Sequence, residues 1–131
     1  MIGDLPRSHI VEVCGVKVGL LGLCEEEWDE LYDERVTEKL VYKDFVEVAK
    51  ELSHDLKKRG CEYIIALTHL RLPNDRLLAE ECQDSVDLIL GGHDHSSICE
   101  KIGRVTIVKS GTDFEEFSDI EIDLNSGTVD R

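Results

Sequence analysis

Three of the five histidines in the chain come directly after apolar, β-rich runs. The run A-L-T leads into His69, and the run L-I-L-G-G leads into His93 and His95. Because α/β proteins gather functional groups at the carboxyl ends of parallel strands, we expect these two runs to deliver the side chains to one edge of a sheet. Imidazole nitrogens are common ligands of zinc, manganese and iron. The spacing therefore predicts a metal site built from His69, His93 and His95.

The two residues before the H-x-H segment are both glycine, Gly91 and Gly92. Glycine reaches backbone conformations that are closed to other residues, so we expect this pair to turn the chain sharply and bring the imidazoles to one point. The H-x-H segment would supply two ligands, and His69 a third. Asp94, in the middle of that segment, could orient its neighbours or face water, and we favour water. The remaining histidines are expected to be ordinary polar residues: His9 and His54.

The segments around these histidines carry clear signals for strands and a helix. An apolar stretch over 10–23, interrupted by Cys14-Gly15, predicts two strands joined by a tight hairpin. Apolar residues at helical spacing predict a helix over 44–59, with Asp44 as its N-cap and Gly60 at its C-terminal end. The elements expected next are a strand at 63–67, a short helix at 73–82 and a strand at 87–90. This alternation predicts an α/β fold with a mixed, partly parallel sheet and helices packed on it.

The remaining segments are distinguished by their acidic composition or by their turn residues. Residues 25–40 are acidic, with apolar residues at roughly helical spacing, and predict an acidic helix or a structured loop. Beyond residue 97 the pattern predicts an antiparallel run of strands at 97–101, 104–109 and 117–124, with a turn at Ile102-Gly103. A turn at 125–127 then leads to the start of a further strand at 128–131.

The composition excludes two classes of partner and favours one compartment. The chain has 131 residues and a formal net charge of −14, which argues against binding nucleic acid through a basic surface. No run of 18 apolar residues occurs, so we expect no membrane-spanning segment. The five cysteines are odd in number and lack C-x-x-C spacing, which is typical of small buried residues in a reducing compartment. With no visible signal peptide, this pattern favours the cytoplasm.

Four short motifs along the chain match, in the same order, those of a known protein family. They are G-V-K-V-G-L-L-G-L at 15–23, T-H at 68–69 followed by D-R-L-L-A at 75–79, D-L-I-L-G-G-H-D-H at 87–95, and V-K-S-G-T-D-F at 108–114. In order and approximate spacing the chain resembles the calcineurin-like metallophosphoesterases, and within them the 5′-nucleotidase branch. The resemblance covers roughly residues 8–125.

This resemblance implies a fold, a cofactor and an activity. The family fold is a four-layer α-β-β-α sandwich of mixed sheets with flanking helices. Two divalent metal ions (manganese, zinc, iron or similar) would bind at the strand ends, with His69 and His93 on one ion and His95 on the other. Such a pair polarises a phosphate and activates the attacking water. The expected reaction is hydrolysis of phosphate esters, with nucleotides as the expected substrates.

The family motifs D-x-H, G-D and G-N-H, which supply the other metal ligands, have no counterpart here. We therefore expect residues 1–131 to form a single partial domain, the C-terminal half of a catalytic domain, with a partial metal site and no assigned catalytic residue. The isolated chain would be inactive. One face of the sheet would lie uncovered, which favours self-association through that face.

Two other functions stay open at the level of sequence. Three histidines with an H-x-H pair also suit a mononuclear zinc enzyme with an open water position, acting on a substrate that is not a phosphate ester. A non-catalytic binding module could keep the same fold without the metal chemistry. The first alternative predicts one tightly bound metal per chain, and the second predicts none.

Overall fold

The computed structural model describes residues 5–26, 41–123 and 128–130. Most of the predicted acidic helix or loop at 25–40 lies outside the described residues, and so does the predicted turn at 125–127. No helix within the described ranges is long and apolar enough to cross a membrane.

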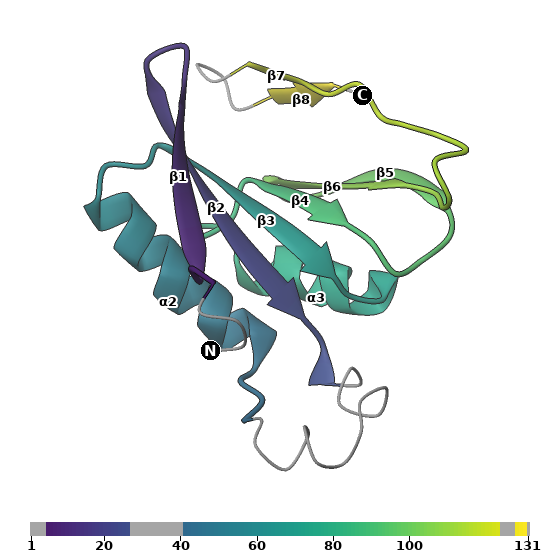
Figure 1. The fold of residues 1–131 in the computed structure, drawn as a ribbon, viewed down its shortest axis with the longest axis horizontal. Helices are drawn as coiled ribbons and strands as arrows, with labels where there is room; N and C mark the ends of the chain where they lie inside the picture. Colours follow the sequence, from purple (N-terminus) through teal and green to yellow (C-terminus); the bar gives the residue numbers. More distant parts are fainter. Residues whose placement is uncertain (1–4, 27–40, 124–127, 131) are drawn as a thin grey trace.

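The core of the fold is a six-stranded mixed sheet with the strand order β1-β2-β3-β4-β6-β5 (Figure 1). Four neighbouring strands, β2, β3, β4 and β6, run parallel, and the two edge strands pair with them antiparallel. The bounds are β1 Ser8–Val13, β2 Val16–Cys24, β3 Tyr63–His69, β4 Leu88–Gly91, β5 Ser97–Ile102 and β6 Val105–Ser110. The predicted α/β fold with a partly parallel sheet is confirmed.

The hairpin between β1 and β2 forms where the sequence predicts it. Val13 pairs with Val16, so only Cys14 and Gly15 form the turn. Both have positive φ angles, 53° and 81°, as the two central residues of a type I′ turn require. This turn matches the natural twist of the two strands, and it positions β1 beside β2 at the edge of the sheet.

Helix α2, Phe45–Lys58, confirms the predicted helix and its ends. The Asp44 side chain accepts hydrogen bonds of 3.0 Å from the amides of Val46 and Glu47. At the other end Gly60 takes a φ of 90°, and its amide bonds to the Lys57 carbonyl at 3.0 Å. The second helix, α3, spans Leu72–Glu81, close to the range predicted for it.

Both helices lie on the same face of the sheet (Figure 1). Their apolar sides pack against alternate residues of the strands, where Ile64, Ala66 and Ile89 are completely buried. Leu56 of α2 and Leu78 of α3 are equally buried in this layer. The helical layer therefore supplies the main hydrophobic core.

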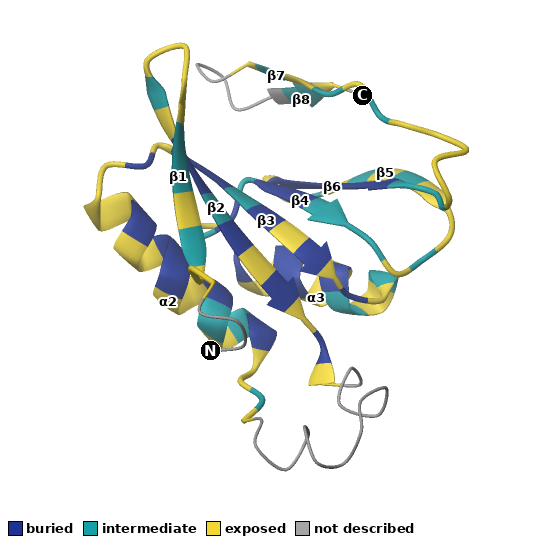
Figure 2. Cartoon of the chain, in the orientation of Figure 1, coloured by how far each residue is buried: buried dark blue, intermediate teal, exposed yellow. Residues whose placement is uncertain are grey.

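The opposite face of the sheet is covered only in part. A small hairpin of β7, Glu121–Asp123, and β8, Thr128–Asp130, contributes Ile122 and Val129 to a second apolar cluster around Tyr63 and Leu88. Near the carboxyl end of β3, Leu67 is 46% exposed. Figure 2 shows exposed segments on β2 and β3 towards their carboxyl ends. Among the described residues, the predicted open face is therefore present only in part, because the β7–β8 hairpin covers the other end.

Two sequence-based predictions are wrong. The segment 117–124 does not extend the antiparallel run, because within its described part, 117–123, the strand is 121–123, and this strand pairs with β8 in a separate sheet. The reason is that β6 already has β4 on one side and β5 on the other. The cysteines are also not all buried: Cys14, Cys24 and Cys99 are exposed, and only Cys61 and Cys82 are buried. The three exposed thiols lie in a turn, at a strand end and on an edge strand.

Candidate metal site

The parallel strands bring two of the three predicted ligands together. His69 is the last residue of β3, and His93 lies in the loop directly after β4, the neighbouring strand. Their ring centroids are 5.4 Å apart and the rings meet edge to face, at 86°. Both residues are exposed at this edge of the sheet. His95 is exposed two residues further along the same loop.

The donor chemistry fits a divalent metal, and the donor set is incomplete. Although His69 is exposed, partial desolvation lowers its pKa, and the neighbouring His93 and Lys109 lower it further, against the opposing effect of Glu25 and Asp75. A neutral imidazole is the form that binds metal. Within residues 5–26, 41–123 and 128–130, no group of three or more His, Cys, Asp or Glu side chains is arranged to hold an ion.

The sharp turn in the loop is centred on His93 itself. The Asp94 amide donates to the Gly92 carbonyl at 3.0 Å, which closes a three-residue turn, and His93 takes a φ of 71°. This is the strained form of γ-turn, rare for a residue with a side chain. The prediction that the two glycines supply the unusual backbone angle is therefore wrong, since neither Gly91 nor Gly92 has a positive φ.

The two glycines are needed for close approach. A Cβ on Gly91 would lie 2.9 Å from Lys109 Cε and 3.1 Å from Asp75 Oδ2. A Cβ on Gly92 would lie 3.1 Å from His69 Nδ1. The first glycine makes room for a buried lysine, and the second lets the loop lie against the imidazole of His69.

A buried ion network beneath the loop is the main feature that the sequence reading missed. The side chain of Lys109, near the carboxyl end of β6, is 1% exposed. Its Nζ donates to the carbonyls of Leu70 and Gly92, both at 2.8 Å, and to Asp94 Oδ2 at 2.6 Å. Asp75 Oδ2 lies 2.6 Å from the same nitrogen. The available signal was a lysine inside an apolar strand, which must find partners if it is buried.

The two carboxylates of this network have different environments. Burial raises the pKa of Asp75, and this outweighs the hydrogen bonds from Lys109 and Thr68 and the charge of Lys109. Burial acts in the same direction on Asp94, but hydrogen bonds from Lys109 and the Leu72 amide lower its pKa overall. The prediction that Asp94 faces water is wrong, because its carboxylate points inward to these donors.

Glu25 is another acidic residue at this edge of the sheet that the sequence motifs did not reveal. Glu25 follows the last residue of β2 and is 4% exposed. Its Oε1 lies 3.1 Å from Arg71 Nε, and its Oε2 accepts from the Asn74 side chain. These bonds hold the segment between β3 and α3, next to His69.

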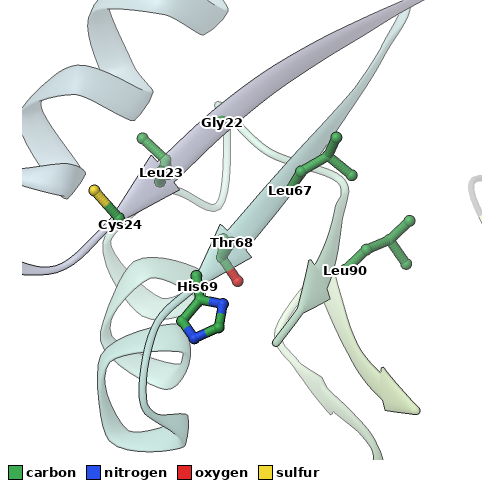
Figure 3. Close-up of a pocket in the computed structure, with 7 residues that line it drawn as sticks. All are labelled: Gly22, Leu23, Cys24, Leu67, Thr68, His69 and Leu90. Atoms are coloured by element: carbon green, nitrogen blue, oxygen red, sulfur yellow. The ribbon is translucent and has the colours of Figure 1, made fainter. Parts of the chain in front are cut away.

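An open hollow of about 420 Å³ lies beside His69 on the uncovered face (Figure 3). Leu67 and Leu90 form part of its apolar wall, and His69 lies at its polar end. The full lining is Gly22, Leu23, Cys24, Leu67, Thr68, His69 and Leu90. The carboxyl edge of the sheet thus combines an apolar surface with a pair of imidazoles.

Comparison with known proteins gives consistent relatives. No protein-family model matches the chain. It is 31% identical over 101 residues to the apyrase of Anopheles gambiae, covering 77% of this chain and 17% of that protein. It is 29% identical over 96 residues to the 5′-nucleotidase of Diplobatis ommata, covering 73% of this chain and 16% of that protein.

The fold has a close structural counterpart. The calcineurin-like phosphoesterase YfkN from Bacillus subtilis superposes with a TM-score of 0.70 at 22% identity, over 84% of this chain and 42% of that one. The chain spans about a sixth of the length of the curated relatives, 17% and 16% of the two above. Proteins named apyrase and 5′-nucleotidase, and structural neighbours of the calcineurin-like phosphoesterase and 5′-nucleotidase type, thus cover about 70–80% of this chain.

Proposed function

We propose that this chain forms part of the metal site of a hydrolase that cleaves phosphate esters of nucleotides. The observation that carries the proposal is the pairing of His69 and His93 at the carboxyl ends of two adjacent parallel strands, with ring centroids 5.4 Å apart. The names of its relatives, apyrase and 5′-nucleotidase, support a nucleotide substrate.

His69 and His93 would hold one divalent ion of the manganese, zinc or iron type, and His95 would bind a second. Two bound metal ions would act as Lewis acids on a phosphoryl oxygen and would activate the water that attacks phosphorus. The chain's own part is to present neutral imidazoles at fixed positions. The apolar hollow beside His69 would limit water around the reacting phosphate.

We further propose that these residues form about half of a catalytic domain. Two observations support this: the described residues hold no group of three metal donors, and the sheet face at Leu67 is open. The remaining ligands would come from a second half-domain that packs on that face. The 131-residue chain alone should therefore release almost no phosphate from adenosine monophosphate.

The test is a titration of the purified chain with Mn²⁺ and Zn²⁺, followed by calorimetry and metal analysis. We expect weak or substoichiometric binding that is abolished in the His69→Ala/His93→Ala double variant. His54→Ala is the matched control, because His54 is exposed on α2, away from the strand ends. One tightly bound ion per chain would point to the mononuclear zinc enzyme, and no binding at all would point to a non-catalytic module.

The open face also suggests what the isolated chain does in solution. We expect it to self-associate through the apolar surface around Leu67 and Leu90. Light scattering should show a mass above 14.8 kDa, and Leu67→Lys should lower it. A stable monomer at high concentration would contradict this expectation. The cytoplasmic location inferred from the cysteines remains a prediction.

A further inference from the structure

The buried ammonium of Lys109 is surrounded by acceptors. Its three N–H donors face four oxygen atoms. These are Leu70 O and Gly92 O at 2.8 Å, and Asp94 Oδ2 and Asp75 Oδ2 at 2.6 Å. A side chain held by four partners cannot rotate without breaking several contacts at once.

Three of these partners, Leu70, Gly92 and Asp94, belong to the two segments that carry the imidazoles. Leu70 directly follows His69, and Gly92 and Asp94 stand on either side of His93. One buried cation therefore links the residue after the first imidazole to both neighbours of the second. A backbone bond from the Gly92 amide to the Thr68 carbonyl, 2.8 Å long, joins the same segments.

The strained turn at His93 explains why such a link is needed. A positive φ at a residue with a side chain persists only where the surroundings hold it in place. Lys109 holds both ends of this turn, through the Gly92 carbonyl and the Asp94 carboxylate. Asp94 is also anchored by the Leu72 amide, at 2.8 Å.

Stability alone gives no reason for this network. The neighbours of Lys109 in β6 are buried apolar residues, Ile107 and Val108. Well-packed apolar groups commonly stabilise a core as well as, or better than, a buried ion pair. Burying a lysine and two carboxylates at this position is therefore better explained by the geometry that it imposes on the loop.

We propose that Lys109, acting with Asp94, is a positioning residue that holds the turn at His93 against the end of β3 and so sets the spacing of the His69 and His93 imidazoles. The consequence for metal binding rests on the proposed function. The positioning of the His93 turn by Lys109 and Asp94 concerns the metal-free chain and can be tested without metal.

The experiment compares Lys109→Met and Asp94→Ala with Asp94→Asn and a control. Lys50→Met is the matched control, because it removes a lysine from an exposed ion pair, Lys50–Glu81 at 3.3 Å, away from the loop. Asp94→Asn keeps an acceptor for the Leu72 amide and should rescue much of the effect. Circular dichroism melts first establish which variants fold.

Two readouts are made on the folded variants. In the metal-free chain, the Gly92 amide reports loop order, because its acceptor, Thr68 O, is untouched by every substitution. We expect its hydrogen exchange to accelerate at least about tenfold in Asp94→Ala, with loss of the NMR contact between the two imidazoles. Zinc affinity should fall roughly 10–100-fold in Asp94→Ala, recover in Asp94→Asn and stay unchanged in Lys50→Met.

Each outcome decides one of the two ideas. Wild-type exchange and ring contact in Asp94→Ala, or wild-type zinc affinity in that variant, would overturn the positioning role and leave the metal site standing. A disordered loop in the variant, together with a wild-type chain that binds no zinc, would support the positioning role and refute the proposed function. If Lys109→Met does not fold, Asp94→Ala decides, because its side chain is 29% exposed and its loss should be tolerated.

Discussion

Replacing Gly91 by alanine should destabilise the chain, although its φ angle suits any residue. The new methyl carbon would lie 2.9 Å from Lys109 Cε and 3.2 Å from Lys109 Cγ. A long side chain often moves aside from such a contact. Here it cannot, because Lys109 Nζ is held by the carbonyls of Leu70 and Gly92 and by two carboxylates.

The size of the effect follows from two opposing terms. Overpacking a well-filled core costs about 1–3 kcal/mol, and we expect the upper part of that range. Alanine also reduces the freedom of the unfolded chain, which returns about 0.4–1 kcal/mol. The net loss should be about 1–2 kcal/mol. At about 4 °C per kcal/mol for a domain of this size, the melting temperature should fall by roughly 4–8 °C.

The assay is urea unfolding, with Gly22→Ala as the matched control. Gly22 lies in β2 on the same sheet, and a Cβ there would meet nothing within 4 Å. Gly22→Ala should leave the midpoint unchanged or raise it slightly, and Gly91→Ala should lower it at an unchanged m-value. If the two variants unfold at the same urea concentration, Lys109 is free to move and the packing argument is refuted.

Three further substitutions test other parts of the structure. Because burial raises the pKa of Asp75, its ionised form lowers stability at neutral pH. The wild-type chain should therefore lose stability as the pH rises from 3.8 through the raised pKa, and Asp75→Asn should remove this part of the pH dependence of the urea midpoint. The Tyr63 hydroxyl is buried without a hydrogen-bond partner among the described residues, and burial, followed by the charge of Asp87, raises its pKa to about 12. Tyr63→Phe should raise the free energy of unfolding by about 1 kcal/mol. Asp44→Ala removes the cap of α2 and should lower the free energy of unfolding by about 1 kcal/mol.

Each of these predictions has a clear contrary result. The same pH dependence in Asp75→Asn as in the wild type would mean that another group titrates in this range. A less stable Tyr63→Phe would mean that the hydroxyl has a partner. An unchanged Asp44→Ala would mean that the two amide bonds at the start of α2 contribute nothing, and Asp44→Asn, which keeps an acceptor, is its control.

Several features were predictable from the sequence because they depend on neighbouring residues only. The turn at Cys14-Gly15 and the cap at Asp44 each involve a few consecutive positions. The apolar residues of α2 recur about once per helical turn, so they too form a local pattern. His69 and His93 each follow an apolar run that predicts a strand, and the carboxyl ends of parallel strands meet at one edge of a sheet. Their placement at one edge was therefore predictable. The local pattern therefore determined the α/β order and the meeting of these two imidazoles.

Other features were decided only by tertiary structure. The burial of Lys109 depends on β6 lying between β4 and β5, and on carboxylates delivered by a helix and by a separate loop. The inward direction of Asp94, predicted to face water, follows from the same network. The β7 pairing was wrong for a related reason, since both edges of β6 were already occupied. Polar partners and strand neighbours come from distant parts of the chain, so only the folded register decides which groups meet.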